Sequence, residues 1–173
     1  MKMDSYRTVS ATPPHTKAPG FTLVEVLVAA AIMGIMFVAL MEAFRTGLQM
    51  LEQSQRMTVA SALAEEVYQM TLTLPLTDPE QPLHWGPETG ESPPFDDVDD
   101  LDAAVFSPPV NADGNVIAGL ADYEQQVTVV SVSKQDLDQV VGDGCSEVSR
   151  VTVVVTCRDT EVCRMSWLAV GQP

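Results

Sequence analysis

The feature that constrains this chain most is an apolar run of 21 residues, Phe21 to Met41 (FTLVEVLVAAAIMGIMFVALM), whose one charged side chain is Glu25. As a helix rising about 1.5 Å per residue, the run is long enough to cross a bilayer core of about 30 Å. A secretory signal peptide would have a shorter apolar core, followed by a cleavage site of small residues. A plain single-pass anchor explains the length but not Glu25, because a carboxylate in a membrane span is costly and normally implies a partner.

The charge of the chain changes sign across this run. The leader before it carries Lys2, Arg7 and Lys17 against Asp4, whereas the whole chain of 173 residues has a net charge of −15. The positive-inside tendency therefore places the leader in the cytoplasm and the acidic remainder outside. The acidic excess argues against a nucleic-acid partner, and three cysteines with two histidines are too few for a zinc framework.

Beyond Met41 the pattern becomes that of an amphipathic helix. Apolar residues recur at steps of three and four, and no proline occurs between Gly20 and Leu74. We expect one continuous helix over 21–72, which Pro75 ends. Its first half would lie in lipid or in a filament core, and its second half would cover a sheet. The predicted contact residues are Phe44, Leu48, Leu51, Val59, Leu63, Val67 and Met70.

The segment 75–109 is rich in proline and acid, which predicts an irregular, solvated loop over the fold. Within it, the stretch 95–102 (FDDVDDLD) holds five carboxylates in seven residues, a composition that suits Ca²⁺. The candidate metal ligands are Asp96, Asp97, Asp99 and Asp100. The EF-hand pattern is absent, so a solvated acidic loop without a cofactor is the favoured interpretation, and Ca²⁺ is kept as the alternative.

The last third of the chain predicts an antiparallel sheet. β-rich runs occur at 122–133, 148–157 and 162–170. In the first of these runs, alternation places Val127 and Val129 on one face, together with Tyr123.

A hairpin is expected between the last two runs. A three-residue loop at 159–161 would set Cys157 opposite Cys163 and Val153 opposite Trp167. The cysteine pair would then have a separation that suits a disulfide, which can persist outside the cytoplasm. The alternative is two small buried hydrophobic residues, and Cys145 leaves the connectivity open.

No catalytic constellation is apparent in the sequence. His15 falls in the leader and His84 stands alone in the proline-rich segment, so a Ser–His–Asp set is not expected. A solvated acidic loop also lacks the buried setting that tunes a carboxylate pair for acid–base catalysis. We therefore do not expect an enzyme.

The residues around the leader junction resemble the type IV prepilin family, which includes the pseudopilins of type II secretion. Gly20 is followed by FTLVE and then by apolar or small residues from Val26 to Ala39. In that family a membrane-embedded peptidase cuts after the glycine and methylates the new amine. The resemblance implies cleavage after Gly20, an N-methylated Phe21, and assembly in which Glu25 meets the Phe21 amine of a neighbouring subunit. It also implies an α+β, pilin-like fold, with a long N-terminal helix packed on a C-terminal antiparallel sheet.

The middle of the chain is similar to the MSHA-type minor pilins, through LPLTDPE at 74–80, FDDVDDLD at 95–102 and the strand that Tyr123 opens. The implied parts are a leader (1–20), a transmembrane half-helix (21–41), an amphipathic half-helix (42–73), a loop region (74–121) and a sheet (122–173). The implied partners are the prepilin peptidase, other pilin or pseudopilin subunits and an inner-membrane assembly platform. The subunit would span the inner membrane once, with its head in the periplasm, before it joins a filament. The alternatives are a pseudopilin of a type II secretion system and a membrane-anchored Ca²⁺-binding or adhesion module.

Overall fold

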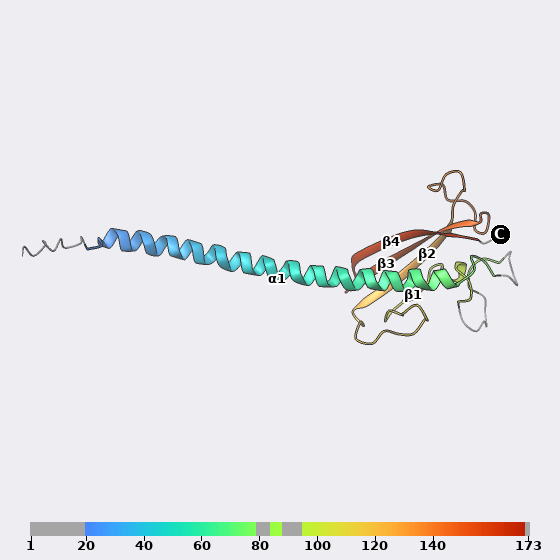
Figure 1. The fold of residues 1–173 in the computed structure, drawn as a ribbon, viewed down its shortest axis with the longest axis horizontal. Coiled ribbons are helices and arrows are strands. Elements are labelled where there is room, and N and C mark those ends of the chain that lie inside the picture. The colour runs from blue at the N-terminus through green and yellow to red at the C-terminus, as the bar shows by residue number, and fades with distance from the viewer. Residues whose placement is uncertain (1–19, 79–83, 88–94, 172–173) are drawn as a thin grey trace, which may run out of the picture. The chain divides into compact units, whose positions relative to one another are not determined.

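The computed structural model describes residues 20–78, 84–87 and 95–171. Its elements are α1 (Leu23–Thr73), the 3-10 helix η1 (Asp99–Leu101), β1 (Val105–Phe106), β2 (Tyr123–Ser131), β3 (Val148–Cys157) and β4 (Thr160–Val170). The strands form one antiparallel sheet in the order β1-β2-β3-β4 (Figure 1). The predicted α+β, pilin-like fold is therefore confirmed. The predicted leader, apart from Gly20, lies outside the described residues.

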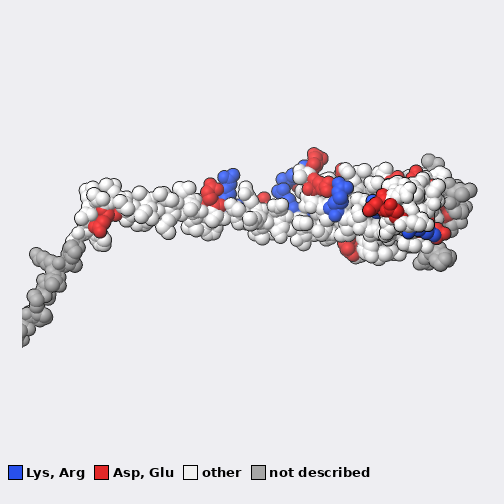
Figure 2. Space-filling view, turned by 90° about the horizontal axis from the view of Figure 1, so that it is seen from above, with Lys and Arg blue, Asp and Glu red and all other residues white. Residues whose placement is uncertain are grey.

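The chain divides into two compact units, 1–47 and 48–173, and α1 contributes residues to both. In the first unit every described side chain is exposed, including the large apolar ones of the run that begins at Phe21. Among the described residues, α1 is the one helix that is long and apolar enough to cross a membrane. Charged side chains are sparse along this part of α1, which is white over most of its length (Figure 2). The first unit thus has an apolar surface that nothing in its own described chain covers.

In the second unit, which we call the head, the C-terminal part of α1 packs on one face of the sheet (Figure 1). The helix residues buried there are Ala60, Leu63, Ala64, Val67, Met70 and Thr71. They meet a valine-rich sheet face formed by Val127 and Val129 of β2 and by Val151, Val153 and Val155 of β3. The two alanines have short side chains, which lets the helix backbone come close to the strands.

The predicted contact stripe of α1 begins too early. Phe44, Leu48 and Leu51 follow the helical period but are 63%, 65% and 57% exposed. The sheet covers the helix only from Val59 onward, so these three side chains have no surface of the head to meet. Periodicity finds an apolar face but does not tell how far along that face the partner extends.

A buried glutamine links α1, the sheet and the loop before β2. Gln125 lies on the inward face of β2 and is 0% exposed. Its amide donates to the carbonyl of Leu63 at 2.8 Å and to that of Val110 at 3.2 Å. Its side-chain oxygen accepts from the N–H of Val110 at 2.8 Å. All of these bonds are shielded from water, so Gln125 fixes the register of the helix on the sheet.

The predicted register of the β3–β4 hairpin is wrong by two residues. The strands are joined by the two-residue turn Arg158–Asp159, with φ of 51° and 61°, and not by three residues. Positive φ at both central positions is the geometry of a tight hairpin turn. Cys157 therefore pairs with Thr160, and a bulge beyond it places Cys163 opposite Val155.

The same shift removes the cross-strand alignment of Cys157 and Cys163 from which the disulfide was predicted. Trp167 faces Val151 in place of Val153, so the whole apolar face moves by one pleat. All three cysteines are free in the structure. Cys157 is buried, whereas the sulfur of Cys163 lies 3.8 Å from the hydroxyl of Ser61 on α1. Cys157 is therefore a small buried side chain, as the alternative expected, and Cys163 is half-buried against α1.

Candidate functional site

The start of α1 is closed by a reciprocal pair of hydrogen bonds between Thr22 and Glu25. The N–H of Thr22 donates to Oε2 of Glu25 at 3.0 Å, and the N–H of Glu25 donates to Oγ1 of Thr22 at 3.2 Å. The Thr22 hydroxyl also donates to Oε2 at 3.1 Å. This is a capping box, in which the two side chains satisfy N–H groups that the first helical turn leaves without partners.

The capping box gives Glu25 a structural role within its own chain, at the first turn of α1. The carboxylate lies at the positive end of the helix dipole and accepts bonds within its own chain. Both bonds that the carboxylate accepts from Thr22 use Oε2, so Oε1 can accept from a donor of another subunit. The sequence interpretation singled out Gly20, Phe21 and Glu25, and all three are exposed at this end of the helix. It missed Thr22, although the pattern T-x-x-E is itself a signal for a capping box.

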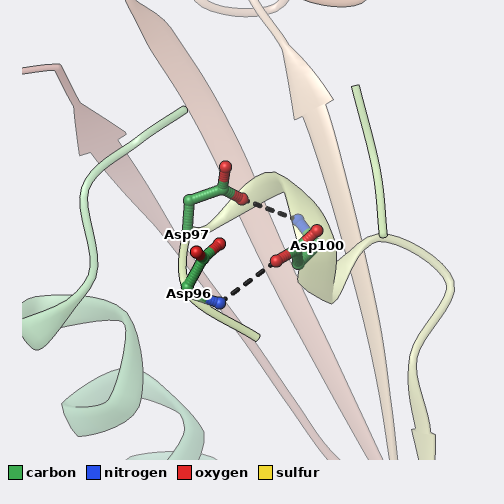
Figure 3. Close-up of side chains that lie close together, drawn as sticks. All are labelled: Asp96, Asp97 and Asp100. Atoms are coloured by element: carbon green, nitrogen blue, oxygen red, sulfur yellow. Dashed lines mark hydrogen bonds between the residues drawn. The ribbon is translucent and has the colours of Figure 1, made fainter. Parts of the chain in front are cut away.

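A second group of functional candidates lies in the head, at the acidic stretch 95–102. Carboxylate oxygens of Asp96, Asp97 and Asp100 lie within 4.8 Å of one another. Figure 3 shows the three side chains turned toward a common centre. The N–H of Asp100 donates to Oδ1 of Asp97 at 3.0 Å, and the N–H of Asp96 donates to Oδ2 of Asp100 at 3.1 Å.

The expectation that this stretch is solvated is wrong for the residues that the structure describes. Asp97, Asp99 and Asp100 are 2%, 1% and 1% exposed. The cause is the apolar residues between them, because Val98 and Leu101 are buried in the helix–sheet core and draw the aspartates inward. The proline-rich remainder at 79–83 and 88–94 lies outside the described residues.

Backbone contacts hold the stretch in place from several sides. The N–H of Val98 donates to the carbonyl of Pro75 at 2.9 Å, just after the end of α1. Oδ2 of Asp99 accepts from the N–H of Gly86 at 3.2 Å, and Oδ1 of Asp102 accepts from the N–H of Val129 at 2.9 Å. His84 reaches the same place, since its Nδ1 lies 3.1 Å from the carbonyl oxygen of Gly86. His15 lies outside the described residues.

Burial sets the electrostatics of these carboxyl groups. Burial, and then a hydrogen bond with the Asp99 side chain, raises the pKa of Asp97 to about 7. Burial likewise raises the pKa of Asp99. No lysine or arginine forms an ion pair with Asp97 or Asp99 among the residues that the structure describes. Asp97 and Asp99 are therefore a buried carboxyl pair in an apolar setting, which the sequence did not predict.

Comparison with known proteins gives a match at one end of the chain. Residues 16–41 match the family model described as the prokaryotic N-terminal methylation motif. No curated protein and no solved structure matches the chain. The matched residues include Gly20, Phe21, the capping box and most of the apolar half of α1. The match supports a type IV pilin-like or pseudopilin subunit, a structural class of protein that is processed by a peptidase, anchored at its N-terminus and assembled with other subunits.

Proposed function

We propose that this chain is a minor pilin-like structural subunit of a type IV pilus or a related filament. The proposal rests on one coincidence: the methylation motif at 16–41 ends in an apolar helix whose described side chains up to Gly47 are all exposed. Burying one large apolar side chain contributes about 1.5–3 kcal/mol, so such a surface is stable only when lipid or other subunits cover it. A membrane-stored subunit meets lipid first and neighbouring helices later.

Processing would supply the group that Glu25 lacks. Cleavage after Gly20 leaves a methylated ammonium on Phe21, and in a filament this group can reach Glu25 of a neighbouring subunit. Opposite charges attract strongly where water is excluded, and a pair at a fixed height sets the axial register of the helices. The Thr22–Glu25 bonds support this role, because they give the carboxylate hydrogen-bond donors while the subunit is stored in the membrane before assembly.

The position of the subunit follows from the same reasoning. The basic leader stays in the cytoplasm, the segment 21–41 spans the inner membrane, and the head stands in the periplasm until assembly. The partners would be the prepilin peptidase, other pilin or pseudopilin subunits and the inner-membrane assembly platform. The similarity of the middle segment to MSHA-type minor pilins favours a pilus over a type II secretion filament. A strain that lacks the chain should lose surface filaments and keep protein secretion, and the opposite result would favour a pseudopilin.

The direct test of the proposal is the N-terminus of the mature chain. Mass spectrometry of the protein from its native membrane should find a chain that begins with N-methyl-Phe21. A Gly20→Leu variant is the matched control, because it keeps the whole of α1 and should retain the leader. An intact leader in the unaltered protein, or a cut at another residue, would contradict the proposal.

A further inference from the structure

The strand β4 forms one edge of the sheet, and its outer side has no paired strand among the residues that the structure describes (Figure 1). We propose that this edge binds an extended segment of a partner protein, which adds a fifth strand beside β4. The segment carries apolar side chains and no net negative charge. The site uses no residue of the methylation motif, so it goes beyond the role as a filament subunit and is tested independently of that role.

The hydrogen bonds of the β3–β4 ladder show which backbone groups of β4 point outward. The N–H of Gly171 donates to the carbonyl of Glu147 at 2.9 Å, where the ladder ends. In an antiparallel pair, residues that bond to the neighbouring strand alternate with residues that do not. By this alternation Ala169 bonds to β3, whereas the N–H and C=O groups of Leu168 and Val170 point away from it. Within the described part of the chain, no hydrogen bond to these outward groups is present.

A groove runs beside this edge. It has a volume of about 660 Å³, and one wall is formed by the consecutive residues 167–171. Successive side chains of a strand point to opposite faces, so a groove that all of these residues line follows the edge of the strand and not one face. The other wall is formed by the last turns of α1 and the chain after it, through residues 71–78. An extended segment of about five residues covers about 17 Å, which matches the length of β4 along the groove.

This part of β4 lacks the features that normally protect an edge strand. Natural edges are blunted by prolines, lysines, bulges or short length. From Met165 to Val170 the strand contains no charged residue and no proline. Arg164, which precedes this part, is paired with Glu161. The opposite edge is β1, which is two residues long and offers little for a further strand to pair with. The open edge of the sheet is therefore the one at β4.

The side chains around the groove indicate the chemistry of the segment. Leu72, Leu168 and Val170 line the groove and are 66%, 42% and 64% exposed. Tyr68 and Trp167, whose ring centroids lie 5.3 Å apart, add aromatic surface. Apolar side chains of a bound segment would cover this surface. No lysine or arginine occurs among the described residues that line the groove, and the chain has a net charge of −15, so an acidic segment would be repelled.

The test uses the full chain in detergent micelles and a synthetic probe. The probe is a short fluorescein-labelled peptide in which valine alternates with threonine between two terminal lysines. Fluorescence anisotropy should show that the peptide binds. The matched control peptide has the same sequence with N-methyl groups on its central residues, which removes backbone donors from both of its edges. It should bind about ten-fold more weakly or less, because main-chain hydrogen bonds hold an added strand.

Hydrogen–deuterium exchange locates the bound peptide. The amides of Leu168 and Val170 should exchange quickly in the chain alone, because no described group accepts from them, and slowly when the peptide is bound. Slow exchange of these amides in the chain alone would show that a segment of this chain or a second copy already occupies the edge. Either occupant would overturn the proposal.

Two variants separate binding at the edge from binding elsewhere on the head. Leu168→Lys places a positive charge on the edge and should weaken binding of the peptide by about ten-fold or more. Thr128→Lys adds the same charge at an exposed position of β2 and should leave binding unchanged. Circular dichroism checks that both variants fold, and Val170→Lys provides a second edge variant if Leu168→Lys does not. Absence of binding to the folded chain, equal binding of the N-methylated peptide, or equal binding by a folded edge variant would overturn the proposal.

Discussion

The first half of α1 and the acidic stretch of the head differ in which side chains they expose to solvent. In the first half of α1, apolar side chains are exposed, with Phe37 61% exposed in the middle of the run. In the head, charged side chains of the stretch 95–102 are buried, with Asp99 1% exposed. A soluble protein usually has the reverse in both places. The first half of α1 therefore exposes the kind of side chain that a soluble domain buries, and the acidic stretch buries the kind that it exposes.

The two regions differ in the physical cost of these unusual positions. The apolar helix lacks a dry surface, which lipid or a neighbouring helix provides without directional bonds. In the acidic stretch, burial raises the pKa of Asp97 to about 7 and also raises the pKa of Asp99, so protonation lowers the cost of burying these two carboxyl groups. Thr22 and Glu25 form a hydrogen-bonded polar pair at the start of the apolar helix. The first region thus offers a surface without directional bonds, whereas hydrogen bonds fix the position of the second.

Separating the two regions should have the largest effect of any change. We expect the fragment 46–173 to be soluble without detergent and to unfold cooperatively, because the helix packs on the sheet only from Val59 onward. The full chain should require detergent. Sedimentation and thermal unfolding, followed by near-ultraviolet circular dichroism, measure both properties.

The matched control for that fragment is a longer deletion. The fragment 68–173 lacks Ala60, Leu63, Ala64 and Val67, which are 0–2% exposed in the head. It should aggregate or lose cooperative unfolding, since each deleted core side chain costs about 2–5 kcal/mol when it is large. Equal behaviour of the two fragments would show that α1 is not part of the core of the head.

Glu25 should have the next largest effect, and on assembly alone. Glu25→Ala is expected to reduce incorporation into filaments by about ten-fold or more, because an ion pair lost where water is excluded costs several kcal/mol. The melting temperature of the head should not change, since no contact of Glu25 reaches it. Quantification of the subunit in sheared filaments, relative to the membrane fraction, measures the effect.

Glu25→Gln then separates charge from helix capping. Glutamine at this position can also form a capping box with Thr22, but it cannot pair with an ammonium. If Gln behaves like Ala, the charge is the property that matters. Normal assembly of the Gln variant would assign the role of Glu25 to the cap and remove the proposed pairing with Phe21.

Much of the fold could be predicted because periodicity reports which face of an element is apolar. It predicted the long helix, the strands near 122–133, 148–157 and 162–170, and the shared face of Val127 and Val129. It could not predict the burial of Asp97, because composition averages over a segment whereas Val98 and Leu101 individually pull their neighbours into the core. A solvated loop was the reasonable expectation for so many acids, and specific packing overrode it.

The register of the β3–β4 hairpin could not be predicted from the sequence, for a different reason. Arg158 and Asp159 adopt positive φ, and neither residue type requires it, so nothing distinguished a two-residue turn from a three-residue one. Alternation places Gln125 on the same face as Val127 and Val129, but its bonds to Leu63 and Val110 join residues far apart in the chain, and the strand pattern does not report such contacts. At the N-terminal site the motif located Gly20, Phe21 and Glu25, and the capping role of Thr22 was present in the pattern but not used.

A third prediction concerns how the head uses buried polar groups that are fully satisfied. Gln125→Met keeps the size of the side chain but leaves the carbonyl of Leu63 and the N–H of Val110 without these bonds. We expect a loss of about 1–3 kcal/mol in the free energy of unfolding of the head. Gln126→Met is the control, because Gln126 is exposed and bonds only to Glu124 among the described contacts. Equal destabilisation by both would show that the buried bonds of Gln125 contribute nothing beyond strand packing.

The smallest effect is expected from a reducing agent. The structure has free thiols at Cys145, Cys157 and Cys163, so dithiothreitol has no bond to break and should leave the melting temperature of the head unchanged. A disulfide between Cys157 and Cys163 would close a short loop, and its loss would lower the melting temperature, if only modestly. Thiol labelling tests for the disulfide more directly than the melting temperature does. Of the three cysteines only Cys145 is exposed, whereas Cys157 is 7% exposed. Without reductant, the folded head should label quickly at Cys145, and the unfolded chain should label at all three. A single labelled thiol in the unfolded chain would restore the disulfide and require the β3–β4 register to shift by two residues.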